Sequence, residues 1–146
     1  RPLATCTVWL AVDDANEENG CLKFIRGSHR DKNLKQHEFN ENKNLTLHQE
    51  LLKSEFNEKE SVNLILKRGQ ISLHDVYLVH GSDANLSSKS RRGMTMRFMP
   101  TTSVFDHNLA KEKYNNLNVS KYSNRKIYLA RGYDKSKRNN LEVVNF

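Results

Sequence analysis

The stretch Gly69–Phe98, GQISLHDVYLVHGSDANLSSKSRRGMTMRF, organises the rest of the chain. Two apolar runs rich in β-branched residues, Ile71–Val79 and Met94–Met99, flank a polar loop, and this pattern predicts a strand, a long loop and a second strand. His80 ends the first predicted strand and Arg91 opens the second. An imidazole and a guanidinium brought together at the mouth of a β structure could hold a metal ion and an anionic co-substrate side by side.

The length and composition fit one domain with a modest core. The chain has 146 residues, of which 36% are hydrophobic, and single domains commonly have about 100 to 150 residues. Its apolar runs are far shorter than the roughly 20 residues that a membrane-spanning helix needs. We therefore expect a single domain over residues 1–146 and no association with a membrane.

The two cysteines, Cys6 and Cys21, each lie inside an apolar run. This placement favours small buried side chains in a reducing compartment over a disulfide. The residues before Thr5 show no signal-peptide pattern and lead directly into a strand-like run. We therefore expect a cytoplasmic protein whose sequence, as given, begins within a domain.

The charge balance raises the question of nucleic-acid binding. There are 24 Lys and Arg residues against 17 Asp and Glu residues, a net charge of +7. These cations are scattered among Asn and Glu residues, and no platform of basic and aromatic side chains is visible. We therefore expect a solvated basic surface, with some attraction for anionic substrates but no nucleic-acid partner.

Further predicted strands lie at short, regular spacing. Thr5–Val12 and Cys21–Ile25 are predicted to form a hairpin with a long loop, and Val62–Leu66 is the next strand. The polar residues 30–60 are interpreted as an insertion or lid, in which Leu45–Leu52 has the spacing of a short amphipathic helix. These patterns favour an all-β sandwich or barrel with little helix.

Residues 104–146 are interpreted as a C-terminal extension. Beyond Pro100 the sequence is predicted to be a polar tail, with a possible edge strand at Ile127–Ala130. From Gly132 onward we expect loose order.

The residue types near His80 suggest a metal site without requiring one. If residues 71–80 form one extended strand, His74 and His80 share a face, and imidazole is a common ligand of iron, zinc and copper. A structural role remains open for both, and His74 is expected to be a hydrogen-bonded histidine. A five-carbon dicarboxylate that chelated a metal at one end would offer its far carboxylate to Arg91, with the Ser82 hydroxyl as a second donor.

Several short motifs recur together and in order. They are Val8–Asp14, Glu18–Leu22, Gly27–His29, Gly69–Asp75, His80–Ser82 followed by Asn85 and Ser87, Arg91–Gly93 and Pro100–Ser103. Taken together, they resemble the phytanoyl-CoA dioxygenase family over nearly the whole chain.

The resemblance implies a double-stranded β-helix, or jelly roll, that binds Fe(II), 2-oxoglutarate and O2 and hydroxylates a small-molecule substrate with decarboxylation of 2-oxoglutarate to succinate. His80 matches the distal iron-binding histidine of the family. Arg91 matches the arginine that binds 2-oxoglutarate, with Arg92 as the neighbouring alternative, and Ser82 matches a position that can contact the same co-substrate. In a loop near the active-site entrance, Arg26 stands where the family usually has proline.

The family's His-x-Asp pair of iron ligands precedes the strand that contains Trp9, so we expect it upstream of Arg1. The chain is then an N-terminally truncated fragment with an incomplete jelly roll, and by itself neither retains iron nor decarboxylates 2-oxoglutarate. Two look-alikes occur, His29-Arg30-Asp31 and His48-Gln49-Glu50. Two alternatives stay open, a related halogenase and a non-catalytic jelly-roll binding protein. The substrate and the oligomeric state are not predicted.

Overall fold

The computed structural model describes residues 2–42, 48–117 and 124–143, with the side chains of the α1 helix described up to residue 112. The chain divides into two compact units. The first, called here the sheet unit, comprises Thr5–His37 and Leu51–Phe98; the second unit comprises Arg1–Ala4, Glu38–Glu50 and Met99–Phe146. None of the described helices is long and apolar enough to span a membrane.

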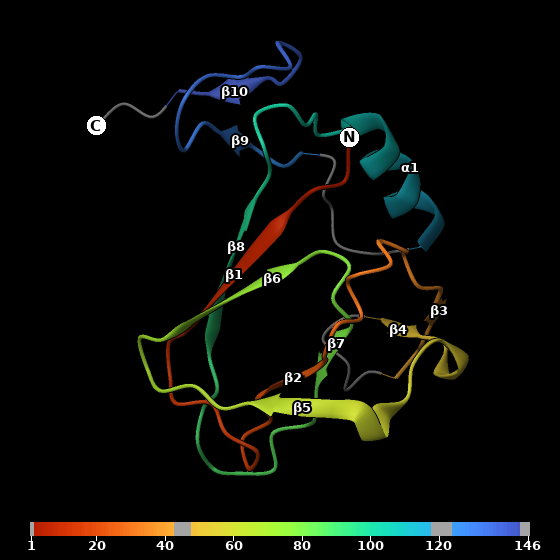
Figure 1. The fold of residues 1–146 in the computed structure, drawn as a ribbon, viewed down its shortest axis with the longest axis vertical. Helices are drawn as coiled ribbons and strands as arrows, with labels where there is room; N and C mark the ends of the chain where they lie inside the picture. The colour runs from red at the N-terminus through yellow and green to blue at the C-terminus, as the bar shows by residue number, and fades with distance from the viewer. Residues whose placement is uncertain (1, 43–47, 118–123, 144–146) are drawn as a thin grey trace. The chain divides into compact units, whose positions relative to one another are not determined.

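The sheet unit contains two three-stranded antiparallel sheets (Figure 1). The first has the order β6-β1-β8, with β1 Cys6–Ala11, β6 Ile71–Asp75 and β8 Gly93–Phe98. The second has the order β5-β2-β7, with β2 Leu22–Ile25, β5 Ser61–Leu64 and β7 His80–Ser82. Strands far outnumber helices among the described elements, which confirms the predicted fold class.

The predicted hairpin of β1 with β2 is wrong. β1 pairs with β6 and β8, whereas β2 pairs with β5 and β7, so the two strands lie in different sheets. The connection between them folds on itself, because the side-chain oxygens of Asn16 and Asn19 each accept the backbone N–H of the other residue, at 3.1 and 2.8 Å. Asn19 is buried and also donates to the Asp14 carbonyl at 2.8 Å. This compact loop carries the chain from one sheet to the other.

The predicted strand through residues 71–80 is broken. β6 ends at Asp75, whose carboxylate accepts the Tyr77 amide at 2.9 Å and whose carbonyl accepts the Leu78 amide at 3.1 Å. These bonds close a turn, and the chain resumes at His80 as β7 in the other sheet. An aspartate that satisfies the backbone two residues further on is a common way of ending a strand.

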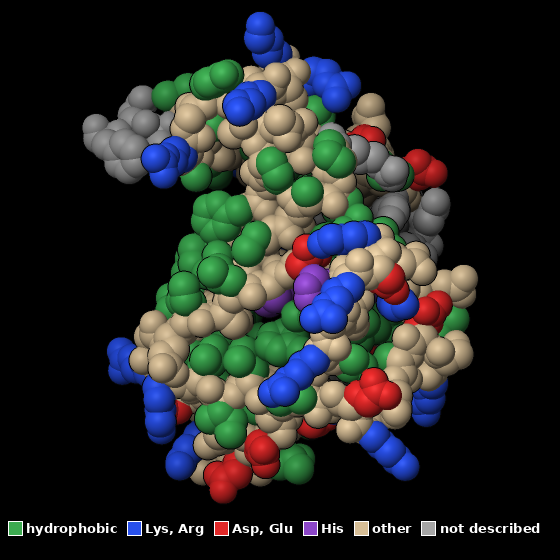
Figure 2. Space-filling view, viewed as in Figure 1, with side chains coloured by type: hydrophobic (Ala, Val, Ile, Leu, Met, Phe, Trp, Pro, Cys, Tyr) green, Lys and Arg blue, Asp and Glu red, His purple; other side chains and the backbone are tan. Residues whose placement is uncertain are grey.

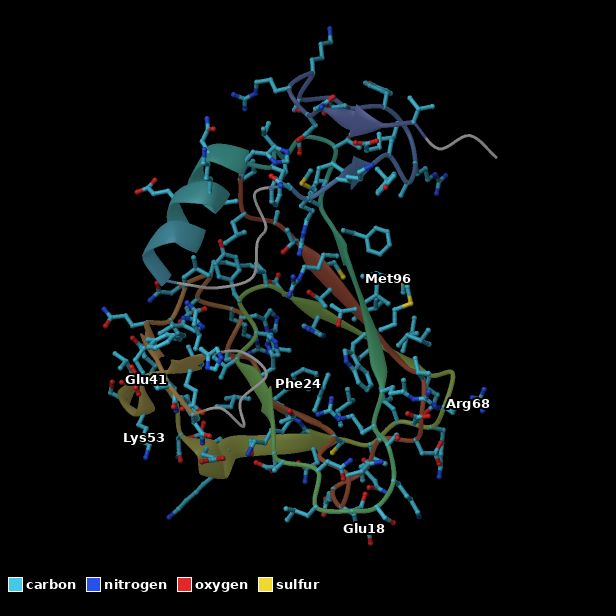
Figure 3. All side chains as sticks on the ribbon, turned by 180° about the vertical axis from the view of Figure 1, so that it is seen from behind. Glu18, Phe24, Glu41, Lys53, Arg68 and Met96 are labelled. Carbon is cyan, nitrogen blue, oxygen red and sulfur yellow. The ribbon has the colours of Figure 1, made fainter. Side chains whose placement is uncertain are left out.

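The two faces of the β6-β1-β8 sheet differ in burial. On one face Trp9 and Ala11 pack with Ala15 and Cys21 into the buried core, against Leu22 and Leu66. The other face leaves large apolar side chains exposed (Figure 2); they are Ile71, Leu73, Met94 and Phe98. Figure 3 shows Met96 on the opposite side of β8 from Phe24.

The cysteines are both free, as expected, but only one is buried. Cys21 belongs to the core, and this burial raises the pKa of its thiol. Cys6, the first residue of β1, is exposed, so the expectation of burial is wrong for this residue.

The polar segment 30–60 contains short strands instead of the predicted helix. β3 His37–Phe39 pairs with β4 Gln49–Leu51, and two single 3-10 turns follow at Lys53–Glu55 and Glu58–Glu60. The helix predicted at Leu45–Leu52 is therefore wrong for Gln49–Leu51, and residues 45–47 lie outside the described residues. Pairing across the hairpin, including Leu52 N to Gln36 O at 3.1 Å, overrides the local helical spacing. The lid interpretation stays a prediction.

The C-terminal region is more ordered than the sequence suggested. α1 His107–Leu117 replaces part of the predicted polar tail, and it starts after Asp106, whose carboxylate accepts the Leu109 amide at 2.9 Å. β9 Ile127–Tyr128 pairs in parallel with β10 Leu141–Glu142 in a separate two-stranded sheet.

The segment after Gly132 is also ordered, against expectation. The Asp134 carboxylate accepts the Ser136 hydroxyl at 2.6 Å and the Asn139 amide at 3.0 Å. These bonds lower the pKa of Asp134 to about 2. The short sequence Asp134–Asn139 therefore closes as a hydrogen-bonded loop.

Candidate functional site

His80 begins β7 opposite Phe24 of β2. Its Nδ1 lies 2.7 Å from the Leu78 carbonyl oxygen. Since a carbonyl only accepts, Nδ1 carries the proton and the neutral ring presents the lone pair of Nε2. Metal-binding histidines commonly hold their second nitrogen in this way. The imidazole is therefore fixed in the tautomer that a metal ligand needs.

The Gly-Ser-His motif positions the backbone just before His80. The Ser28 hydroxyl accepts the Val79 amide at 2.8 Å, and the Val79 carbonyl accepts the Ile25 amide at 3.0 Å. Gly27 makes the preceding turn at φ +77°, a conformation that favours glycine. Val79 is buried, so both of its backbone groups depend on these partners. Sequence reasoning missed this role of Ser28, although a Gly-Ser pair at a strand end is a detectable signal.

Arg91 lies beside Ser82 and is not paired with a carboxylate of any described residue. Its Nη2 donates to the Ser82 hydroxyl at 3.3 Å, and its Nε is buried without a partner within the part of the chain that the structure describes. A guanidinium with unused donors is suited to bind a carboxylate through two parallel hydrogen bonds.

Arg92, the neighbouring alternative, is already engaged. Its Nε and Nη2 each lie 2.8 Å from a carboxylate oxygen of Asp13, and its backbone amide donates to the same carboxylate at 2.9 Å. These bonds hold the pKa of Asp13 well below its usual range and raise the pKa of Arg92. The structure thus leaves Arg91 as the arginine with free donors.

His74 lies next to His80 even though the strand between them is broken. The ring centroids are 5.0 Å apart, and Phe24, labelled between the ribbons of the two sheets in Figure 3, lies 5.5 Å from His74. The His74 side chain is only 8% exposed, and burial, followed by the charges of His80 and Arg97, lowers its pKa to about 4. The ring is therefore neutral near pH 7. Figure 2 shows histidine surface beside lysine and arginine side chains.

The expectation of a hydrogen-bonded His74 is not met at its Nδ1. Its Nδ1 is buried without a partner among residues 2–42, 48–117 and 124–143. A buried imidazole nitrogen without a partner costs roughly 1–3 kcal/mol. Such a group calls for an explanation, which the surrounding described side chains do not supply.

The look-alike motifs are bound into local structure. The Asp31 carboxylate accepts Lys35 Nζ and the Asn33 amide, both at 3.1 Å. His48 Nδ1 lies 3.2 Å from the Asn40 carbonyl oxygen, to which it is hydrogen-bonded. Among the described residues, no group of three or more His, Cys, Asp or Glu side chains is arranged to hold a metal ion. His80 fits such an ion as one ligand, by its free Nε2.

Comparison with known proteins gives a consistent family. The profile of the phytanoyl-CoA dioxygenase family matches residues 1–93. The "Phytanoyl-CoA dioxygenase domain-containing protein 1 homolog" of Caenorhabditis briggsae is 35% identical over 97 residues, which cover 63% of this chain and 33% of that protein. The homolog of the same name in Dictyostelium discoideum is 32% identical over 100 residues, covering 67% and 36%. The chain thus spans about a third of the length of these relatives.

Two solved structures share the fold. The apo form of the non-heme monooxygenase ThoJ aligns with a TM-score of 0.55 at 23% identity, covering 67% of this chain and 34% of that one. EvdO2 from Micromonospora carbonacea var. aurantiaca, complexed with 2-oxoglutarate, also aligns with a TM-score of 0.55, at 24% identity, covering 64% and 37%. These likenesses confirm the predicted jelly-roll fold, and the family match extends over well more than half of the chain. The chain belongs to the phytanoyl-CoA dioxygenase family.

Proposed function

We propose that this chain provides part of the active site of an Fe(II)- and 2-oxoglutarate-dependent dioxygenase that hydroxylates a small molecule. The observation that carries the proposal is the Arg91 guanidinium beside the Ser82 hydroxyl, on a loop that leads from His80; it has no carboxylate partner and a buried, unpaired Nε among the described residues. Family membership supports the reaction class, because the matching profile is that of a dioxygenase family. In the reaction one O2 molecule is divided between succinate and the hydroxylated product, and the co-substrate loses CO2.

His80 is the residue that would hold iron. Its Nε2 carries the lone pair, and the bond from Nδ1 to the Leu78 carbonyl keeps the ring in that tautomer. When bound, iron supplies the oxidative chemistry, and the protein supplies orientation and electrostatics. The remaining ligands are, in this proposal, a His-x-Asp pair that precedes β1, as the family resemblance implies.

Arg91 and Ser82 would bind the distal carboxylate of 2-oxoglutarate. The Ser82 hydroxyl accepts a bond from Arg91 and makes no other bond with a described residue, so its own proton is available to a carboxylate oxygen. A guanidinium that is charged at every physiological pH provides the opposite charge. The pair therefore offers an anion at least two donors from adjacent side chains.

The test is an anaerobic titration of the complete protein with Fe(II) and 2-oxoglutarate, monitored by charge-transfer absorption. Succinate formation is then measured after O2 is admitted. Arg91→Met is expected to weaken 2-oxoglutarate binding about 10- to 150-fold, since a charged hydrogen bond contributes about 1.5–3 kcal/mol. Arg92→Met is the matched control and should change that affinity by about two-fold or less, because Arg92 is occupied by Asp13. An absence of the absorption band, or equal losses in the two variants, would refute the assignment.

The product pattern distinguishes the alternatives. Binding of 2-oxoglutarate without succinate would indicate a jelly-roll binding protein, and a halogenated product would indicate a halogenase. Residues 1–146 alone are expected to form no succinate. Succinate formation by that chain that is lost in His29→Ala or His48→Ala would instead give a look-alike motif the metal role.

A further inference from the structure

The inner face of the β6-β1-β8 sheet is polar next to His80. Thr7 of β1 is paired with His74 on one side and with Arg97 on the other, so these three side chains form one row across the sheet. The next row on the same face is Ser72, Trp9 and Thr95. The contact of His74 with Phe24 of the opposite sheet shows that this face is the inner one. Neither row contains a carboxylate.

Two polar groups on this inner face are buried without hydrogen-bond partners among the described residues. His74 is 8% exposed, and its Nδ1 is buried without a hydrogen-bond partner among the described residues; the Ser72 hydroxyl is likewise buried and unpaired within the described ranges. Buried polar groups are nearly always satisfied, so an exception points to a missing partner. The position of His74, with its ring centroid 5.0 Å from that of His80, places this missing partner beside the proposed metal ligand.

Arg97 adds a charge to the same row. It is exposed, it belongs to no ion pair among the described residues, and it is near enough to act electrostatically on His74. It is distinct from Arg91, which lies before β8 and contacts Ser82. The row that contains His74 therefore carries a cationic side chain of its own, separate from the guanidinium proposed to bind the co-substrate.

We propose that His74 is a substrate-recognition residue and that, together with Arg97, it selects a small polar substrate carrying an anionic group. His74 donates or accepts a hydrogen bond near the reacting carbon, and Arg97 binds the anion further along the row. A hydrocarbon chain in this position would leave the imidazole and the Ser72 hydroxyl unpaired, and sites built to hydrogen-bond a substrate reject analogues that lack the matching group. This inference rests on the proposed function and deepens it.

A stability measurement separates recognition from a structural role for His74 and requires no ligand. His74→Phe replaces an unsatisfied buried group by an apolar ring beside Phe24, so the urea midpoint of unfolding is expected to rise. His37→Phe is the control, because His37 is exposed on β3, with its Nδ1 bonded to the Lys35 carbonyl, and its midpoint should not change. A fall in the midpoint of His74→Phe would show that His74 serves the fold and would overturn the proposal.

The substrate class is tested with the complete protein, Fe(II) and 2-oxoglutarate. Hydroxycarboxylates of two to six carbons, and in parallel their methyl esters, are scored for stimulation of succinate formation above the substrate-free rate. We expect stimulation from the acids only. For the best acid, kcat/KM should fall at least about ten-fold in His74→Phe and in Arg97→Met, and His74→Gln should restore part of the loss.

In both variants the KM for 2-oxoglutarate should remain within two-fold of wild type, since Arg91 and Ser82 are unchanged. Stimulation by esters only, or by neither set, would overturn the substrate class. Loss of Fe(II) binding in His74→Phe would make His74 a metal ligand and would also overturn the proposal. A wild-type protein without substrate-free succinate or a charge-transfer band would refute the proposed function itself, whereas the stability comparison would still decide the role of His74.

Discussion

Gly93→Ala tests how tightly the start of β8 packs against the central strand of its sheet. A Cβ added at Gly93 would overlap Cζ2 and Cε2 of the Trp9 ring and would lie 2.6 Å from its Nε1. The indole is only 7% exposed, and it belongs to the buried core cluster. The ring therefore has little room to move, and either the backbone of β8 or the core must shift.

The expected cost is about 2–3 kcal/mol, at the upper part of the range for inserting a methyl group into a packed core. A loss of about 2 kcal/mol is a roughly 30-fold change in the unfolding equilibrium. Arg91 lies two residues before this contact, and the Arg92 carbonyl accepts the Val12 amide at 3.0 Å. A shift of β8 at Gly93 therefore also moves the guanidinium proposed to bind the co-substrate.

The assay is urea unfolding followed by tryptophan fluorescence, because Trp9 is the single tryptophan of the chain. Gly81→Ala is the matched control: no atom lies within 4 Å of an added Cβ there, and the residue is in the extended strand β7. This control should be neutral or slightly stabilising. A Gly93→Ala midpoint equal to that of Gly81→Ala would refute the packing argument.

Two further predictions concern the surroundings of His80. Ser28→Ala removes the acceptor of the buried Val79 amide and should lower the free energy of unfolding by about 1–3 kcal/mol, whereas Ser28→Thr should retain most of the stability. Urea unfolding and hydrogen exchange at the Val79 amide measure both effects. Unchanged protection of this amide in Ser28→Ala would contradict the role of Ser28. Because the pKa of His74 is lowered from 6.5 to about 4, the unfolded chain takes up the proton first as the pH falls. The contribution of His74 to the free energy of unfolding should be fully present above pH 6.5 and should be lost towards pH 4, by at most about 3 kcal/mol. His74→Phe should remove this part of the pH dependence.

The sequence identified most strands because local composition determines them. The runs around Trp9, Phe24, Leu64 and Met96 all form strands within a few residues of the predicted ends. Strand pairing is a long-range property, and no local signal showed that β1 would join β6 and β8 instead of its neighbour β2. The hairpin prediction failed for this reason.

α1 was missed although Ala110, Tyr114 and Leu117 recur at helical spacing in its sequence, HNLAKEKYNNL, because this stripe is short and most of the segment is polar. The capping signal was present, since Asp106 precedes the helix and its carboxylate accepts the Leu109 amide. Local hydrogen bonding of a polar cap thus adds information where the hydrophobic periodicity is weak. The same holds for Asp134, whose carboxylate organises a loop in a segment expected to lack order.

His74 and His80 lie close together as predicted, but the predicted cause, a single strand that contains both, is wrong. Alternation along one strand put both on one face, yet the strand ends at Asp75, and the two histidines belong to different sheets. They meet because residues 76–79 carry the chain across between facing sheets, and the crossing is held at Val79 by Ser28 and Ile25. If both histidines lay in one strand, inserting or deleting a single residue between them would move His80 to the opposite face. In the observed crossing, His80 is oriented by its pairing with Phe24 and by its bond to the Leu78 carbonyl, so the geometry of the candidate site depends on the length of this segment and on the Gly-Ser-His turn that receives it.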